Sequence, residues 1–199
     1  MCAAPISAGE VAWTDADADW ERLQVAAAAA FAARDLAGSA HDWAAALRIA
    51  RANFGADDPR LATSLANYAT ALRQKGEPVA ARLWQEALEI WDAAPAWLAR
   101  QRFAPRARSS IFHLRLEAKH GGAYDENLRR RAETLLHAAR AAGASLAAGG
   151  PARAPDRAVF QTFLSAPRDA MRKVLAAAHL LAAPAPDQDA GAQAAQEGP

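Results

Sequence analysis

Histidines are the first residues to consider for chemistry, because an imidazole can carry a proton or bind a metal ion near neutral pH. His113 and His120 are seven residues apart, so one continuous helix would place them on the same face. Seven residues rise about 10 Å along a helix, too far for both side chains to bind one ion. Together with His41, His137 and His179, they are interpreted as surface or helix-end residues, and no metal or cofactor is expected.

Catalytic motifs are absent from the sequence. It contains no glycine-rich phosphate loop, no His-Glu-x-x-His, no Ser-x-x-Lys and no Gly-x-Ser-x-Gly. The single cysteine, Cys2, excludes a cysteine-based zinc site and an internal disulfide. We therefore expect a protein that is not an enzyme. A helical enzyme subunit that uses His113, His120 and nearby carboxylates stays open as an alternative.

Arginines gather in the third quarter of the chain, and a guanidinium suits planar, two-pronged recognition of carboxylate or phosphate. Residues 99–140 carry ten basic and four acidic residues, about +6, whereas residues 1–60 carry five and nine, about −4. Three interpretations stay open: a solvated surface, a site for an acidic peptide or protein, and a nucleic-acid surface of a regulatory subunit. The net charge of +1 and the lack of a nucleic-acid motif weaken the third. The arginines are Arg100, Arg102, Arg106, Arg108, Arg129, Arg130 and Arg131.

Composition predicts an all-helical fold. Alanine dominates the chain of 199 residues, while the β-branched residues are sparse. This length suits one domain with tails. The first residues lack a basic stretch followed by a long apolar run, and no segment is long and apolar enough to span a bilayer. A cytoplasmic protein without a membrane partner is therefore expected.

Glycine and proline divide the chain into predicted helices. Breaks are expected at Gly38-Ser39, at Gly55 to Pro59, at Gly76 to Pro78, at Ala93 to Pro95 and at Gly121-Gly122. In the second of these, Asp58 and Pro59 are typical of a helix start. The predicted organisation is a flexible leader over 1–15, helical repeats over 16–142, a linker over 143–155, a C-terminal helical segment over 156–182 and a disordered tail over 183–199.

An internal recurrence is the most informative feature of the sequence. Trp43-Ala44-Ala45-Ala46-Leu47-Arg48-Ile49 returns 41 positions later as Trp84-Gln85-Glu86-Ala87-Leu88-Glu89-Ile90. On a helix, positions 84, 87, 88 and 91 lie on one face. The tryptophan can fill the space between helix layers, and the alanine allows a neighbouring helix to approach. A period in this range indicates stacked helix pairs.

The span from Ala46 to Ile90 resembles the tetratricopeptide repeat, and within it the long repeats of kinesin light chains. The resemblance is close over residues 40–92, weak back to about 18, and only a helix-pair rhythm forward to about 142. It implies a short right-handed α-solenoid of about three antiparallel helix pairs with C-terminal capping helices. The last helices could instead dock into the groove or form a dimer.

The resemblance also implies a function. In this family the first helix of each pair lines a concave groove that binds extended peptides, and Asn67 matches an asparagine that recurs there. The chain is therefore expected to be an adaptor or scaffold for a protein or peptide partner, an acidic one among the candidates. The expected partner-binding residues are Thr63, Asn67, Thr70, Arg73 and Gln74 in the groove, with Arg100, Arg106 and Arg108 beside it.

Overall fold

The computed structural model describes residues 13–101, 111–155 and 170–183, and it is all-helical there. The predicted tail from 184, the leader up to residue 12, residues 156–169 of the C-terminal segment, and Arg102, Arg106 and Arg108 lie outside the described residues. The helices are α1 (Asp15–Ala32), α2 (Leu36–Asn53), α3 (Pro59–Gln74), α4 (Ala80–Ala99), α5 (Ile111–Ala147) and α7 (Ala170–His179).

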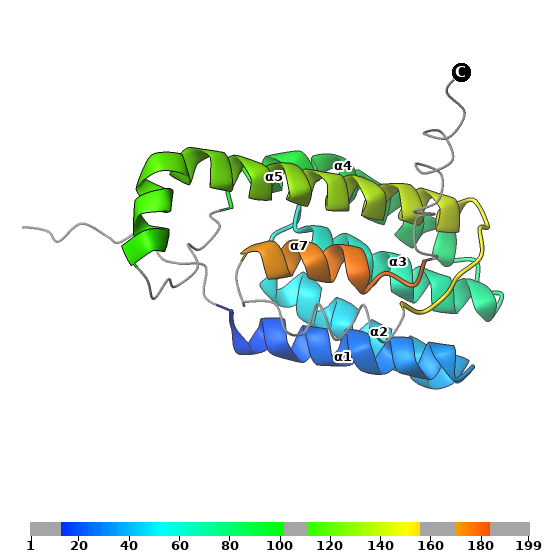
Figure 1. Cartoon of the computed structure of the whole chain (residues 1–199). Helices are drawn as coiled ribbons and strands as arrows, with labels where there is room; N and C mark the ends of the chain where they lie inside the picture. The colour runs from blue at the N-terminus through cyan, green and yellow to red at the C-terminus, as the bar shows by residue number, and fades with distance from the viewer. Residues whose placement is uncertain (1–12, 102–110, 156–169, 184–199) are drawn as a thin grey trace, which may run out of the picture.

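Consecutive helices pack against one another as antiparallel neighbours (Figure 1). The pairs α1–α2 and α3–α4 form hairpins, and α2 packs on α3 while α4 packs on α5. The last helix, α7, returns to lie against α3 and α5, between the first hairpin and the long α5. Helices α2 and α4 are thus both second members of hairpins, as the recurrence predicts. In the described parts of the chain, no helix combines the length and hydropathy needed to span a bilayer.

Local capping sequences explain where the first two helices begin. Thr14 and Asp17 form a capping box at the start of α1. The break expected at Gly38-Ser39 is wrong, because the chain turns earlier, at Arg34, whose φ is +64°. The Asp35 side chain then accepts a hydrogen bond from the Gly38 N–H at 2.8 Å. A Cβ at Gly38 would lie only 2.2 Å from Asp35 Oδ2, so this glycine makes room for the cap instead of ending a helix.

The boundaries of α3 agree with the sequence. The Asp58 carboxylate accepts from the Arg60 N–H at 2.9 Å, and Pro59 occupies the first turn. At the other end, Gly76 has a φ of +76°, and the N–H groups of Gly76 and Glu77 bond back to Arg73 and Leu72. These two hydrogen bonds, together with a glycine in the left-handed conformation, form the Schellman motif, which satisfies the last carbonyls of the helix.

Three expected breaks are wrong, because the helices continue through them. Helix α4 runs through Pro95, and the helical turn beyond it buries Trp97 and Leu98. Helix α5 runs through Gly121-Gly122, where each glycine costs only about 1 kcal/mol relative to alanine. It also runs through Gly143, so the predicted linker over 143–155 starts inside α5, which ends at Ala147.

Tryptophans occupy the core of the stack, as their helical spacing predicts. Trp43 is fully buried, and Trp84 and Trp91 are nearly so. The Trp43 ring packs against Phe31 of α1, with 5.3 Å between ring centroids. Each hairpin therefore contributes large aromatic surface to the space between neighbouring helices, which is the main apolar stabilisation of a stacked arrangement.

Candidate functional site

The inner face of α3 is covered by the C-terminal segment, residues 170–183. Thr63, Asn67 and Thr70 lie on α3 and are fully buried. The Thr63 hydroxyl donates to the Ala177 carbonyl at 2.6 Å, whereas the Thr70 hydroxyl donates to Ala66 within its own helix. Of the five predicted groove residues, Thr63 and Asn67 therefore contact the main chain of residues 177–182, and that main chain is the protein's own.

Asn67 contacts two backbone groups of the chain just after α7. Its amide nitrogen Nδ2 donates to the Leu180 carbonyl at 2.5 Å, and its oxygen Oδ1 accepts from the Ala182 N–H at 2.6 Å. One primary amide thus satisfies both an acceptor and a donor of a non-helical stretch. Since neither bond involves a side chain of the bound stretch, this arrangement can hold a peptide of varied sequence by its backbone.

A buried polar network orients the Asn67 amide. Gln24 of α1 accepts a second hydrogen bond from Asn67 Nδ2 at 3.0 Å and donates from Nε2 to Ser64 at 3.1 Å. The Trp20 indole N–H also donates to Ser64, at 2.7 Å. Because Gln24 takes one amide hydrogen of Asn67, the other hydrogen and the oxygen point to the bound backbone. The network therefore fixes the orientation of the Asn67 amide.

Buried charges lie at one end of the same face. Arg60 donates to Asp58 through Nη2 at 2.7 Å and pairs with Asp17 through Nη1. Its guanidinium also stacks 3.7 Å from the Phe54 ring centroid. Burial alone would raise the pKa of Asp17, but hydrogen bonds and charge from Arg60, with bonds from Thr14, outweigh it and lower that pKa. Arg60 therefore favours the ionised form of the Asp17 carboxylate despite its burial.

Two cations of α7 meet this acidic end. Arg172 forms a two-pronged ion pair with Glu21 of α1, at 3.0 Å from Nε and 2.5 Å from Nη2. Lys173 is also buried, close to the charges of Arg60, Asp17 and Asp58. Burial and Arg60 lower the pKa of Lys173, while the two carboxylates oppose that change.

The remaining predicted site residues are not gathered on this face. Arg73 turns to the end of α5, where it donates to the carbonyls of Leu146 and Gly150. Gln74 is exposed. Arg100 is exposed and pairs with Asp57. Arg106 and Arg108 lie outside the described residues. The predicted single groove surface is therefore divided between the α3 face, the end of α5 and the outer end of α4.

The basic region is partly used within the fold. Arg129 donates to the carbonyls of Leu98 and Gln101, at 3.0 and 3.4 Å, which ties α5 to the end of α4. Arg130 forms an exposed pair with Glu126. Among the described residues, no three His, Cys, Asp or Glu side chains come together as metal ligands would.

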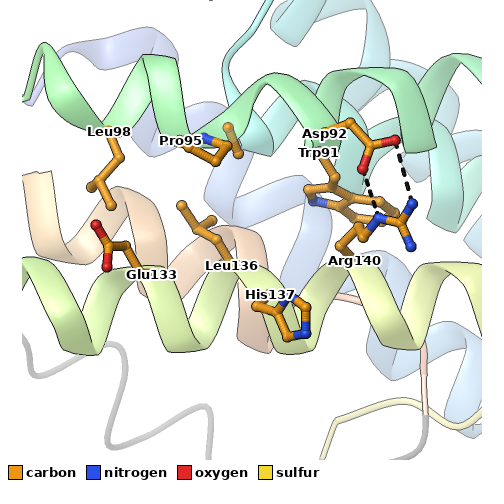
Figure 2. A pocket seen from close by; sticks show the side chains of 9 residues that line it. Trp91, Asp92, Pro95, Leu98, Glu133, Leu136, His137 and Arg140 are labelled. Atoms are coloured by element: carbon orange, nitrogen blue, oxygen red, sulfur yellow. Dashed lines mark hydrogen bonds and ion pairs between the residues drawn. The ribbon is translucent and has the colours of Figure 1, made fainter.

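A half-open cavity of about 450 Å³ lies between α4 and α5 (Figure 2). Its walls are mostly apolar and include Trp91, Pro95 and Leu136. The ion pair of Arg140 with Asp92, 2.7 Å from Nε to Oδ1, stands at one side of it and lowers the pKa of Asp92. The Trp91 indole N–H is buried without a hydrogen-bond partner among the described residues. The cavity is separate from the contacts of Asn67.

Sequence reasoning missed three residues that act at the α3 face: Gln24, Glu21 and Arg172. The available signal was on α1, where Trp20, Gln24 and Phe31 follow the helical spacing of a buried stripe. A glutamine on such a stripe must find hydrogen-bond partners from another helix. The partner of Glu21 could not be found this way, because it lies 151 residues away in the sequence.

Comparison with known proteins identifies no relative. No family model, no curated protein and no solved structure matches the chain.

Proposed function

We propose that this protein is a protein–protein interaction adaptor that binds a peptide segment of its partner on the inner face of α3. The observation that carries the proposal is the Asn67 amide, which holds the Leu180 carbonyl and the Ala182 N–H at 2.5 and 2.6 Å. In this proposal, Asn67 binds the backbone of a partner segment through the same two hydrogen bonds that it makes with the protein's own chain.

The stacked hairpins support the same proposal. A right-handed solenoid would present the first helix of each hairpin, α1 and α3, on one side of the stack. Both helices contribute to the face that the C-terminal segment covers: Asn67 from α3, with Glu21 and Gln24 from α1. A binding face built from rigid helices can hold a ligand without rearranging its own backbone, which lowers the cost of binding.

The test is a peptide-display selection against the immobilised full chain. Selected peptides are expected to bind the wild type, to lose at least about tenfold in affinity with Asn67→Ala, and to keep their affinity with Thr70→Val. Thr70 is the matched control because it is buried on the same helix and its hydroxyl bonds only within α3 among the described residues.

Hydrogen exchange provides the second readout. A peptide that occupies this face should displace residues 180–182. Hydrogen exchange of the Ala182 N–H, which donates to Asn67 Oδ1 in the structure, should then become faster. If the selected peptides bind Asn67→Ala as well as the wild type, and leave Ala182 protected, the α3 face is not where this protein binds its partners.

A further inference from the structure

The α3 face carries a definite pattern of charge, shape and backbone contacts. Resting on the function proposed above, we propose that it selects a basic helical turn followed by a short non-helical leucine–alanine stretch. Residues 170–183 occupy the site as an intramolecular ligand of this kind, and a partner segment of the same chemistry must displace them.

Charge complementarity identifies the basic part of the ligand. On the side of α1 and α3, the buried carboxylates of Asp17, Glu21 and Asp58 face only one buried guanidinium, that of Arg60. Two net negative charges remain; Arg172 of α7 pairs with Glu21, and Lys173 is buried close to Asp17 and Asp58. An acidic segment would leave Glu21 buried without a partner, because Asp17 and Asp58 are already paired with Arg60, and breaking a buried pair costs several kcal/mol.

Shape identifies the apolar part of the ligand. Val174 and Ala177 are fully buried on one face of α7, where they belong to an apolar cluster with side chains of α4 and α5 beside the α3 face. The Thr63 hydroxyl holds the backbone at this point by donating to the Ala177 carbonyl at 2.6 Å. Beyond His179 the helix ends, and Leu180 and Ala182 are fully buried in the stretch that Asn67 holds.

The two anchors give the ligand a direction. Glu21 binds the basic turn, and Asn67 binds the backbone eight and ten residues later, at Leu180 and Ala182. Glu21 requires a cation, and Asn67 requires a backbone C=O and N–H that are not used within a helix. A segment bound in the reverse direction cannot meet both requirements. The arrangement thus distinguishes a basic-then-apolar segment from the opposite order.

Occupation from within the chain also regulates access. Asn67 and Thr63 have no exposed surface while residues 170–183 are in place. A partner reaches them only after this segment leaves, so the apparent affinity of any partner is reduced by the fraction of molecules that are closed. A variant that weakens the segment without altering the face should therefore bind the same ligand more tightly.

The experiment uses the full-length chain and a fluorescent peptide with the sequence of residues 170–183, followed by fluorescence anisotropy. Arg172→Glu places a negative charge against Glu21 and is expected to release the internal segment. The peptide should bind this variant about a hundredfold more tightly than the wild type, since breaking a buried ion pair commonly costs that much or more.

Two controls isolate the cause. Arg153→Glu makes the same charge change at an exposed position and should leave peptide binding as weak as in the wild type. The double change Glu21→Arg with Arg172→Glu restores a buried pair with its charges exchanged, so the site should close again. This rescue separates release of the segment from a general loss of folding, which far-UV circular dichroism checks independently.

The outcomes separate this inference from the proposed function. If the peptide binds the wild type and Arg172→Glu equally, residues 170–183 do not guard the site and the inference is overturned. It is also overturned if a peptide with glutamate in place of both cations binds Arg172→Glu as tightly as the native one, although the α3 face would then still be a peptide site. If neither peptide binds a folded Arg172→Glu, the proposed function falls with it.

Discussion

At the scale of residues, the central feature is a set of buried polar side chains that satisfy one another across helices. Gln24 and Asn67 are fully buried, and the hydrogen bond between their side chains joins α1 to α3. An unsatisfied buried polar group costs about 1–3 kcal/mol, so each member of such a network depends on the geometry of the others. The orientation of the Asn67 side chain therefore depends on the relative positions of α1 and α3.

Replacing Gln24 tests this dependence. Gln24→Leu has similar volume but removes the acceptor for one hydrogen of Asn67 Nδ2, so we expect a loss of about 1–3 kcal/mol in the free energy of unfolding. Exchange of the Ala182 amide should also become faster, although Gln24 itself bonds only Asn67 and Ser64 among the described residues. Urea denaturation and hydrogen exchange measure the two effects. Gln74→Leu, at an exposed position, should change neither.

The Asp17–Arg60 pair predicts an acid-dependent stability. The pKa of Asp17 is lowered in the fold from its ordinary value of 3.8, so its carboxylate contributes stability that is present above 3.8 and is lost as the pH falls through the folded-state pKa. At pH 7, Asp17→Asn should cost about 2–3 kcal/mol. The difference in melting temperature between variant and wild type should shrink below pH 3.8. A difference that stays constant down to pH 2 would contradict this assignment.

At the scale of elements, contacts between helices decide where some helices continue. Gly143 lies in α5 against the Trp91 ring of α4, and a Cβ at this glycine would lie 2.1 Å from Trp91 Cζ3. The glycine therefore allows the close approach of α4 and α5 that a helix-breaking interpretation does not foresee. Arg129 and Arg140 add polar ties between the same two helices.

Gly143→Ala distinguishes these two roles. If the glycine only weakened the helix, alanine would stabilise the protein by up to about 1 kcal/mol. Because the added methyl group must displace the Trp91 ring, we expect instead a loss of about 1–3 kcal/mol. The urea midpoint measures the sign. Ala144→Gly at the next position should destabilise only by the helix-propensity difference, about 1 kcal/mol.

At the scale of the whole molecule, the two ends of the described chain are joined through the α3 face. The C-terminal segment packs on α3 and α5 and forms its ion pair with α1. Residues separated by more than a hundred positions thus become direct partners. Under the inference above, conditions that weaken the docking of this segment should therefore increase access to the α3 face.

If residues 170–183 undock as proposed, we expect His179, at the end of α7, to make their docking sensitive to pH. Burial and the charge of Arg131 lower its pKa from 6.5, so the docked state favours the neutral imidazole. As the pH falls below 6.5, the undocked segment takes up a proton first and docking weakens. Exchange of the amides of residues 180–182, corrected for intrinsic rates, should rise by up to about tenfold at pH 5.5 relative to pH 7.5. His179→Gln should remove this rise, and His137→Gln, at an exposed position of α5, should not.

The sequence by itself determined the features that depend on neighbouring residues. Alanine-rich composition gave helices, Asp58-Pro59 and Gly76 gave the ends of α3, and the recurrence from Trp43 to Trp84 gave two comparable hairpins. Each rests on interactions within a few residues, namely capping bonds, allowed backbone angles and helical spacing. These are encoded locally and can be read from the order of residues alone.

Only the tertiary structure decided what covers the α3 face and where α4 and α5 end. Pro95 and Gly143 interrupt a helix by their local preference, yet burial of Trp97, Leu98 and Trp91 keeps both helices continuous. Thr63 and Asn67 were recognised as polar residues with binding capacity, but their partners lie 113 to 115 residues away. No local pattern specifies such a pairing, because it depends on the combined packing of α1, α3, α5 and α7.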